Sequence, residues 1–160
     1  MDVKKITRLG LYTTIALTIF LLEAALPAMA PGMKLGLANI VTLYVLSRHT
    51  GTEALLVLLV RVVLASIFAG QMVLFVYSLC GGLFALLAMV VFYRFLGKRY
   101  IYLVSIMGGV AHNIGQILAA VYLMRMSGML AYAPYMVISG IFTGLFNGLV
   151  CFFMEKRIPQ

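Results

Sequence analysis

The stretch from residue 71 to residue 92, QMVLFVYSLCGGLFALLAMVVF, decides the fold class. It contains no charged side chain, and its apolar residues follow one another without alternation. A helix needs about 20 mainly apolar residues to cross the hydrocarbon core of a bilayer. The strands of a membrane barrel instead alternate apolar and polar residues. The stretch therefore predicts one transmembrane helix.

Similar apolar runs fill most of the remaining chain. The sequence has 160 residues, of which 64% are hydrophobic and 10% charged, whereas soluble domains have roughly 45–50% apolar and about 25% charged residues. We expect a single domain, an all-α bundle of six transmembrane helices at about 9–27, 35–47, 53–69, 71–92, 101–124 and 133–154. The first run is long for the apolar region of a signal peptide, so we expect it to be a retained helix. Six spans leave no room for a soluble catalytic domain.

The charges predict which side of the membrane each loop faces. Positively charged residues collect in cytoplasmic loops. If both termini are cytoplasmic, the outer loops hold only Lys34 and Arg125, and the inner segments hold Lys4, Lys5, Arg8, Arg48, Arg94, Lys98, Arg99, Lys156 and Arg157. This bias explains the net charge of +8. The sequence shows no basic stripe with interleaved aromatic residues, the pattern that would indicate binding of nucleic acid. We expect a multi-pass protein of the inner (plasma) membrane, whose surroundings are lipid.

Arg61 is an ionisable residue near the middle of the third expected span. Its insertion costs about 2.5–3.5 kcal/mol, so such residues are functional candidates. One interpretation is an ion pair with Glu23, the only acidic residue that we expect within a span, which would fix helix positions. The other is contact with an anionic or strongly polar ligand, because the planar guanidinium suits carboxylate and phosphate. The sequence leaves both open.

The fifth expected span carries His112, Asn113 and Gln116. His112 and Gln116 are four residues apart and share a helix face, whereas Asn113 lies about 100° round the helix. Three hydrogen-bonding groups in lipid favour the wall of a cavity. A metal site is disfavoured because no second His or Cys has ligand spacing, and nothing indicates a cofactor.

Depth along the expected spans groups eight polar residues between the middle of the membrane and its outer surface. The inner half has few comparable groups. We therefore predict one substrate-binding pocket that opens outward, is covered by the first loop at 28–34, and is lined by Glu23, Lys34, Asn39, Arg61, Ser78, His112, Asn113 and Gln116.

Small residues recur every four positions on the last two expected spans. Gly140, Gly144 and Gly148 do so on the sixth span, and Ala111, Gly115 and Ala119 on the fifth. Such ridges allow helix backbones to approach closely. They predict tight packing within one bundle, or a face for a partner subunit.

Several strings carry a family resemblance. They are PGMKLGLANI at 31–40, the residues from Glu53 to Arg61, YSLCGG at 77–82, HNIGQ at 112–116 and SGIFTG at 139–144. Over about residues 10–150 the chain resembles the bacterial Gx transporter family, also labelled heptaprenyl diphosphate synthase component I. That family is similar to the substrate-binding S components of energy-coupling factor (ECF) vitamin transporters, six-helix proteins whose outer pocket is covered by the first loop.

The resemblance implies a membrane subunit that binds a small molecule for uptake. The ligand would be vitamin-like or an isoprenoid or quinone precursor, and the partners would be energising transport subunits, namely a transmembrane coupling subunit and ATPases. S components carry an Ala-x-x-x-Ala motif toward the inside of the first helix. Ala24 and Ala28 have this spacing but lie farther outward.

The synthase label implies a different role. Prenyl diphosphate synthases hold magnesium and diphosphate with aspartate-rich motifs, and magnesium is bound through carboxylates and substrate phosphates. This chain has one aspartate, Asp2, so it is not a self-sufficient synthase. It leaves the alternative of a non-catalytic accessory membrane subunit that works beside a soluble prenyl synthase. His112 has no obvious serine partner for nucleophilic catalysis, and we expect no enzymatic activity.

Overall fold

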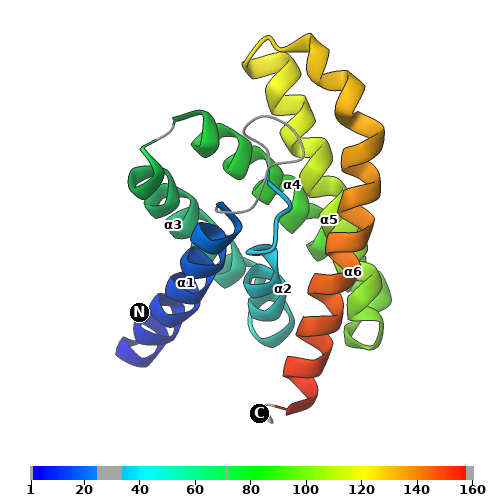
Figure 1. Ribbon diagram of the computed structural model, residues 1–160. Coiled ribbons are helices and arrows are strands. Elements are labelled where there is room, and N and C mark those ends of the chain that lie inside the picture. Colours follow the sequence, from blue (N-terminus) through cyan, green and yellow to red (C-terminus); the bar gives the residue numbers. More distant parts are fainter. Residues whose placement is uncertain (1, 25–33, 71, 158–160) are drawn as a thin grey trace.

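The computed structural model describes residues 2–24, 34–70 and 72–157, and these parts of the chain are helical without any strand. Five long helices dominate (Figure 1): α1 (Val3–Ala24), α3 (Gly51–Ala69), α4 (Met72–Leu96), α5 (Ile101–Leu118) and α6 (Ala133–Arg157). The shorter helices are α2 (Asn39–Arg48), η1 (Lys98–Tyr100), η2 (Ala119–Leu123) and η3 (Ser127–Tyr132). Within the described residues, five helical stretches are long and apolar enough to cross a membrane.

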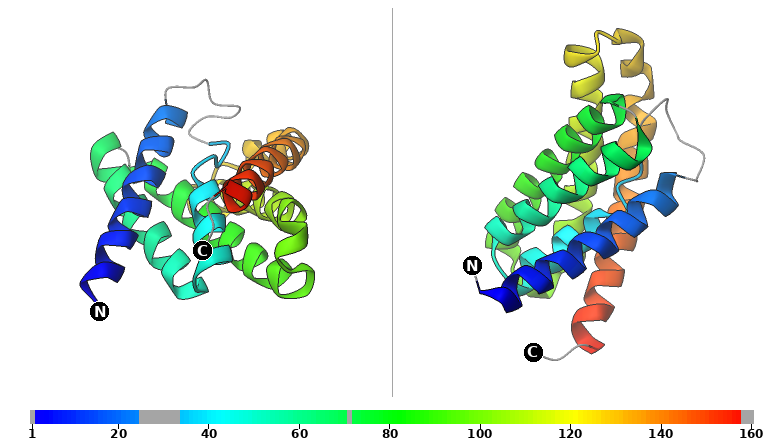
Figure 2. Two further views of the ribbon diagram at one scale, coloured as in Figure 1. Left: turned by 90° about the horizontal axis from the view of Figure 1, so that it is seen from below. Right: turned by 90° about the vertical axis from the view of Figure 1, so that its left-hand side faces the viewer.

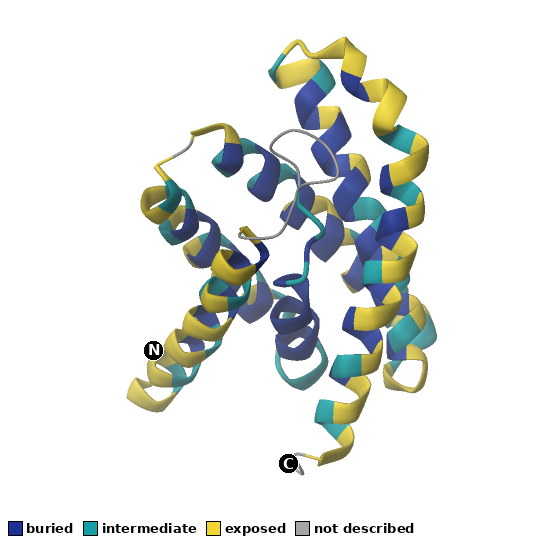
Figure 3. Cartoon of the chain, viewed as in Figure 1, coloured by how far each residue is buried: buried dark blue, intermediate teal, exposed yellow. Residues whose placement is uncertain are grey.

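The expected span at 35–47 is shorter in the structure than a membrane-crossing helix. α2 has 10 residues, which at 1.5 Å per residue is about 15 Å, half of the roughly 30 Å hydrocarbon core. Residues 34–38 are not helical, and Gly36 has a φ of +84°, in the left-handed region. Every residue of α2 from Asn39 to Leu46 is buried (Figure 3). The run is apolar because other helices surround it, not because it faces lipid.

The helices alternate in direction along most of the chain. α1, α3 and α5 run one way, whereas α2, α4 and α6 run the other (Figures 1 and 2). α1 begins and α6 ends at the same end of the bundle, where the α2–α3 and α4–α5 connections also lie. We call this the terminal end.

α5 lies between α4 and α6 and packs extensively against both. A Cβ atom added at Gly109 of α5 would lie 2.3 Å from the carbonyl oxygen of Gly140, and one at Gly144 would lie 2.7 Å from the backbone of Ile106. Gly115 meets α4 in the same way, at 2.8 Å from the carbonyl oxygen of Cys80. The glycine ridges therefore bring helices of this chain together, as small residues do in membrane bundles.

The outer surfaces of the long helices are apolar. Large side chains such as Leu87, Phe142 and Phe153 are more than half exposed, and exposed positions recur along the whole of α1 and α6 (Figure 3). Soluble proteins rarely expose large contiguous apolar surfaces. The chain is therefore a multi-pass membrane protein with a helical bundle fold.

Candidate functional site

Residues 34–38 pass through the interior of the bundle as a non-helical segment whose backbone is bonded by side chains from three helices. Glu23 of α1 accepts the N–H groups of Gly36 at 2.7 Å and Leu37 at 2.9 Å. Gln116 of α5 accepts the Lys34 N–H at 3.3 Å, and Asn147 of α6 donates to the Gly36 carbonyl at 3.1 Å. Non-helical backbone at membrane depth requires such partners.

The His112 ring is held between this segment and α4. A Cβ atom at Gly36 would lie 2.8 Å from Cδ2 of the ring, and one at Gly81 of α4 would lie 2.8 Å from Cε1. On the third side, Nε2 of His112 is 3.0 Å from the side-chain nitrogen of Gln116. Glycine is needed at both positions because any side chain there would displace the imidazole. Gly36 is needed doubly, since its φ is also positive.

Two cations lie beside these groups. Arg61 of α3 is 3% exposed, and its Nε has no hydrogen-bond partner. Arg61 is close enough to Glu23 and to His112 for its charge to act on both side chains. The ammonium of Lys34 also lacks a hydrogen-bond partner and lies 3.6 Å from the centroid of the Phe20 ring. Asn39 lies here too, because a Cβ atom at Gly36 would be 3.0 Å from its side-chain nitrogen. We call Glu23, Lys34, Asn39, Arg61, His112 and Gln116 the central cluster.

The central cluster has more positive than negative charge. Glu23 is its only carboxylate, and both of its oxygens accept backbone N–H groups. Among the residues that the structure describes, neither Arg61 nor Lys34 forms an ion pair with it. The sequence-based alternative of a Glu23–Arg61 ion pair is therefore not present. Burial lowers the pKa of Lys34, Glu23 opposes this shift, and Arg61 adds to it.

Six of the eight expected site residues thus lie together, and two do not join them. Asn113 turns toward α6 and donates to the Met136 carbonyl, as its position about 100° from His112 requires. Ser78 is buried on α4, but no described contact links it to the cluster. The expected cover at 28–34 falls outside the described residues except for Lys34. In the described part of the chain, no group of three or more His, Cys, Asp or Glu is arranged to hold a metal ion.

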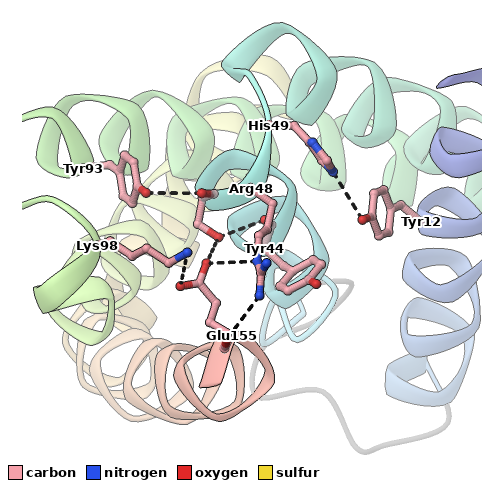
Figure 4. Close-up of polar contacts among 8 residues, drawn as sticks. Tyr12, Tyr44, Arg48, His49, Tyr93, Lys98 and Glu155 are labelled. Carbon is pink, nitrogen blue, oxygen red and sulfur yellow. Dashed lines mark hydrogen bonds and ion pairs between the residues drawn. The ribbon is translucent and has the colours of Figure 1, made fainter. Parts of the chain in front are cut away.

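A second polar cluster lies at the terminal end, where we expected few such groups. Glu155 of α6 meets Lys98 at 3.0 Å and Arg48 at 3.9 Å, and it accepts the hydroxyl of Ser47 (Figure 4). Nearby, the Tyr93 hydroxyl donates to the Ser47 carbonyl at 3.4 Å. Glu155 therefore joins α6 to α2 and to the turn before α5.

Glu53 is the other carboxylate at this end, and it lies inside α3. The expectation that Glu23 is the only acidic residue within a span is therefore wrong. Glu53 is 6% exposed and pairs with Lys5 at 2.8 Å and Arg8 at 3.4 Å. Its own N–H donates to the Thr50 hydroxyl. The sequence carried a signal for this position, because Thr50 and Glu53 have the Thr-x-x-Glu spacing that is typical of a helix start and that places Glu53 in the first turn. We call Glu53, Glu155 and their cationic partners Lys5, Arg8, Arg48 and Lys98 the terminal-end cluster.

His49 lies beside the terminal-end cluster, in the connection between α2 and α3. Its Nε2 is 3.3 Å from the Tyr12 hydroxyl of α1 (Figure 4). Burial lowers the pKa of His49, and the charge of Arg8 adds to this shift.

Asn147 is the remaining residue that our sequence analysis missed, although an asparagine within the last span carries the same signal as Asn39.

Comparison with known proteins gives one family. The family model described as heptaprenyl diphosphate synthase component I matches residues 12–154. No curated protein and no solved structure matches the chain.

Proposed function

Because the chain belongs to the heptaprenyl diphosphate synthase component I family, we propose that it is a non-catalytic membrane subunit of polyprenyl diphosphate synthesis. The observation that carries this proposal is how its carboxylates are used. The chain has four acidic residues. Glu23 is bonded to backbone, Glu53 and Glu155 are paired with cations, and Asp2 is exposed near the chain start.

Prenyl transfer requires magnesium held by carboxylates and substrate phosphates. With every buried carboxylate already engaged, the chemistry belongs to a separate soluble prenyl synthase. The membrane subunit would bring that enzyme to the bilayer, into which a long polyprenyl chain partitions. This role fits a chain whose mass lies almost entirely in helices.

The proposed topology places the terminal end in the cytoplasm, with six crossings that include the segment before α2 together with α2. It is supported by the charges: of 12 Lys and Arg residues, all but Lys34, Arg61 and Arg125 belong to the terminal end, which leaves nine. Cytoplasmic segments carry such an excess. A soluble synthase would then dock at this end.

The test is reconstitution. The purified chain in lipid nanodiscs is combined with the soluble synthase from the same cells, and product chain length and rate are measured. We expect the two to co-purify and the nanodisc-bound chain to raise the yield of long product. An unrelated membrane bundle of similar size in the same nanodiscs is the control. Equal yield with both nanodiscs, together with no co-purification, contradicts the proposal.

A second candidate is a substrate-binding subunit for uptake of a small molecule, similar to an S component. The observation that favours it is the central cluster, where the buried Arg61 and the half-buried Lys34 have no ion-pair partner among the described residues. It predicts recovery of energising transport subunits with the chain, and a loss of ligand binding in Arg61→Ala and His112→Ala. Recovery of a soluble synthase without transport ATPases contradicts it.

A further inference from the structure

We infer that the central cluster binds a singly charged organic oxyanion, that is, a carboxylate or a phosphodiester. This names the chemical class of a ligand, and it does not depend on which of the two proposed functions holds. The inference comes from the charge, the free hydrogen-bonding atoms and the surroundings of the cluster.

The hydrogen bonds of Gln116 determine the protonation of His112, and with it the charge of the cluster. Gln116 uses its carbonyl oxygen to accept the Lys34 N–H, so its amide nitrogen faces Nε2 of His112. An amide nitrogen only donates, so Nε2 must accept, and His112 is neutral. Lys34 and Arg61 then give two positive charges against one negative charge on Glu23, a net charge of +1.

A buried charge without a counter-ion is strongly unfavourable. A monoanion brings the cluster to neutrality. A phosphate monoester, with a charge of about −1.5 to −2, overshoots it, and a diphosphate does so further. Because the described residues offer no site where carboxylates gather to hold magnesium, that excess negative charge would stay uncompensated.

The unpaired atoms match the oxygens of such an anion. Arg61 Nε and Lys34 Nζ are both buried donors without hydrogen bonds, and the Asn39 side-chain amide is also unpaired. Asn39 is the first residue of α2, and the start of a helix carries partial positive charge. In membrane transport proteins, the starts of half-length helices in the middle of the bilayer point at anionic groups in this way.

The surroundings of the two cations are apolar. Phe20 lies against Lys34 and packs with Ala38, Ala65 and Leu74 in one hydrophobic cluster, and Ala65 is one helical turn from Arg61. Apolar surroundings strengthen a charged hydrogen bond. They also favour an anion whose other atoms are hydrocarbon.

Binding by the purified chain alone, in a neutral detergent without added lipid or magnesium, tests the inference. The probes are octanoate, dibutyl phosphate, farnesyl diphosphate and the uncharged octanol, and affinity is measured by calorimetry. We expect octanoate or dibutyl phosphate to bind at least about tenfold more tightly than farnesyl diphosphate, and octanol not to bind. The ratio of octanoate to dibutyl phosphate tells a free acid from a phospholipid headgroup.

Variants locate the site. Arg61→Met should weaken binding of the preferred probe by about 10- to 100-fold, the loss of a charge-assisted hydrogen bond. Arg61→Lys keeps the positive charge without the planar guanidinium, and its affinity for the probe should fall by less than that of Arg61→Met. Arg94→Met, which removes an exposed cation of α4, is the matched control and should bind normally. Thermal unfolding of each variant checks that it is folded.

Three results would overturn the inference. They are tightest binding of farnesyl diphosphate, no binding of either monoanion, and unchanged binding by folded Arg61→Met. Because no synthase is present in this assay, its outcome is independent of the reconstitution that tests the proposed function.

Discussion

The two charged clusters of this chain use their charges in opposite ways. In the terminal-end cluster, Glu53 and Glu155 each meet two cations. In the central cluster, Arg61 and Lys34 meet no carboxylate at ion-pair distance among the described residues, and Glu23 bonds to backbone instead. The first arrangement joins helices. The second leaves two cations without a counter-ion among the described residues.

Position in the bundle explains why both can exist. The terminal-end cations Lys5, Arg8 and Lys98 have side chains that are more than a third exposed, so their charges are solvated as well as paired. Arg61 is 3% exposed in the middle of the bundle, so its charge is neither solvated in this way nor paired with a carboxylate among the described residues. A membrane protein keeps a charge of that kind where it serves a ligand or a pathway. The contrast therefore separates charges that join helices from charges that we propose to serve a ligand.

The largest expected effect is on the paired side of this contrast. Glu155→Gln keeps the shape of the side chain and removes its charge, leaving Lys98 and Arg48, whose side chain is 9% exposed, with one counter-charge fewer. Breaking a buried ion pair from one side costs about 3–5 kcal/mol, and we expect a loss near the lower value because Lys98 is partly exposed. Thermal and detergent-induced unfolding measure it.

The control for Glu155→Gln is Asp2→Asn, which removes an exposed acid and should leave the unfolding temperature unchanged. If Glu155→Gln is as stable as the parent chain, the ion pairs of the terminal-end cluster do not hold the helix ends, and the contrast fails on that side.

The next effect concerns the backbone segment that positions the central cluster. Gly36→Ala imposes a positive φ on a residue with a Cβ and drives that atom to 2.8 Å from the His112 ring. Backbone strain of this kind costs of order 1–3 kcal/mol, and the clash adds to it. Gly70→Ala separates the two causes, because Gly70 also has a positive φ, +63°, but open space around it.

We therefore expect Gly36→Ala to lower the free energy of unfolding more than Gly70→Ala does, and to weaken probe binding as well. Gly70→Ala should lose only about 1 kcal/mol and bind normally. Equal losses in the two variants would mean that the packing of His112 against Gly36 contributes nothing.

Arg61→Met gives a third effect, opposite in sign to that of Glu155→Gln. Replacing a buried charge by an apolar side chain of similar volume is often neutral or stabilising by about 1–4 kcal/mol. Because Arg61 is unpaired, we expect the unfolding temperature of Arg61→Met to stay equal to or rise above that of the parent, measured without ligand. A loss as large as that of Glu155→Gln would show that Arg61 is structural.

The sequence predicted the long helices because length and continuous hydrophobicity are local properties. It also predicted that six polar residues would meet, because depth along a span and a separation of four residues are readable from spacing alone. Asn113 was grouped with them by depth, although its direction, 100° away, already separated it from His112.

What the sequence did not predict depends on tertiary packing. The apolar run at 35–47 reads the same whether lipid or protein surrounds it, and only the enclosing helices make α2 a buried half-length helix. The partners of Glu155 lie on α2 and η1, far away along the chain. The bonds from Glu23 to Gly36 and Leu37 are not marked by any motif, since the acceptors of non-helical backbone are set by where the segment passes.

The smallest expected effect is a pH dependence of ligand binding that comes from Lys34. Burial lowers the pKa of Lys34, so the ligand-free chain releases this proton at a lower pH than a free lysine does. The charged groups that face Lys34 are Glu23 of α1 and Arg61 of α3. A bound monoanion favours the charged ammonium, so binding takes up a proton.

Affinity for octanoate should therefore fall as the pH rises through the ligand-free pKa of Lys34, by at most about tenfold per pH unit. Stability of the ligand-free chain should change in the other direction. Between the lowered pKa of Lys34 in the folded chain and the ordinary lysine pKa, the unfolded chain binds more protons than the folded chain, so the contribution of Lys34 to stability increases with pH in that window. Lys34→Met should abolish both slopes while Arg61 still binds the anion weakly. Calorimetry and thermal unfolding over the same pH series measure the two slopes, and an affinity slope that persists in Lys34→Met assigns the proton to another group.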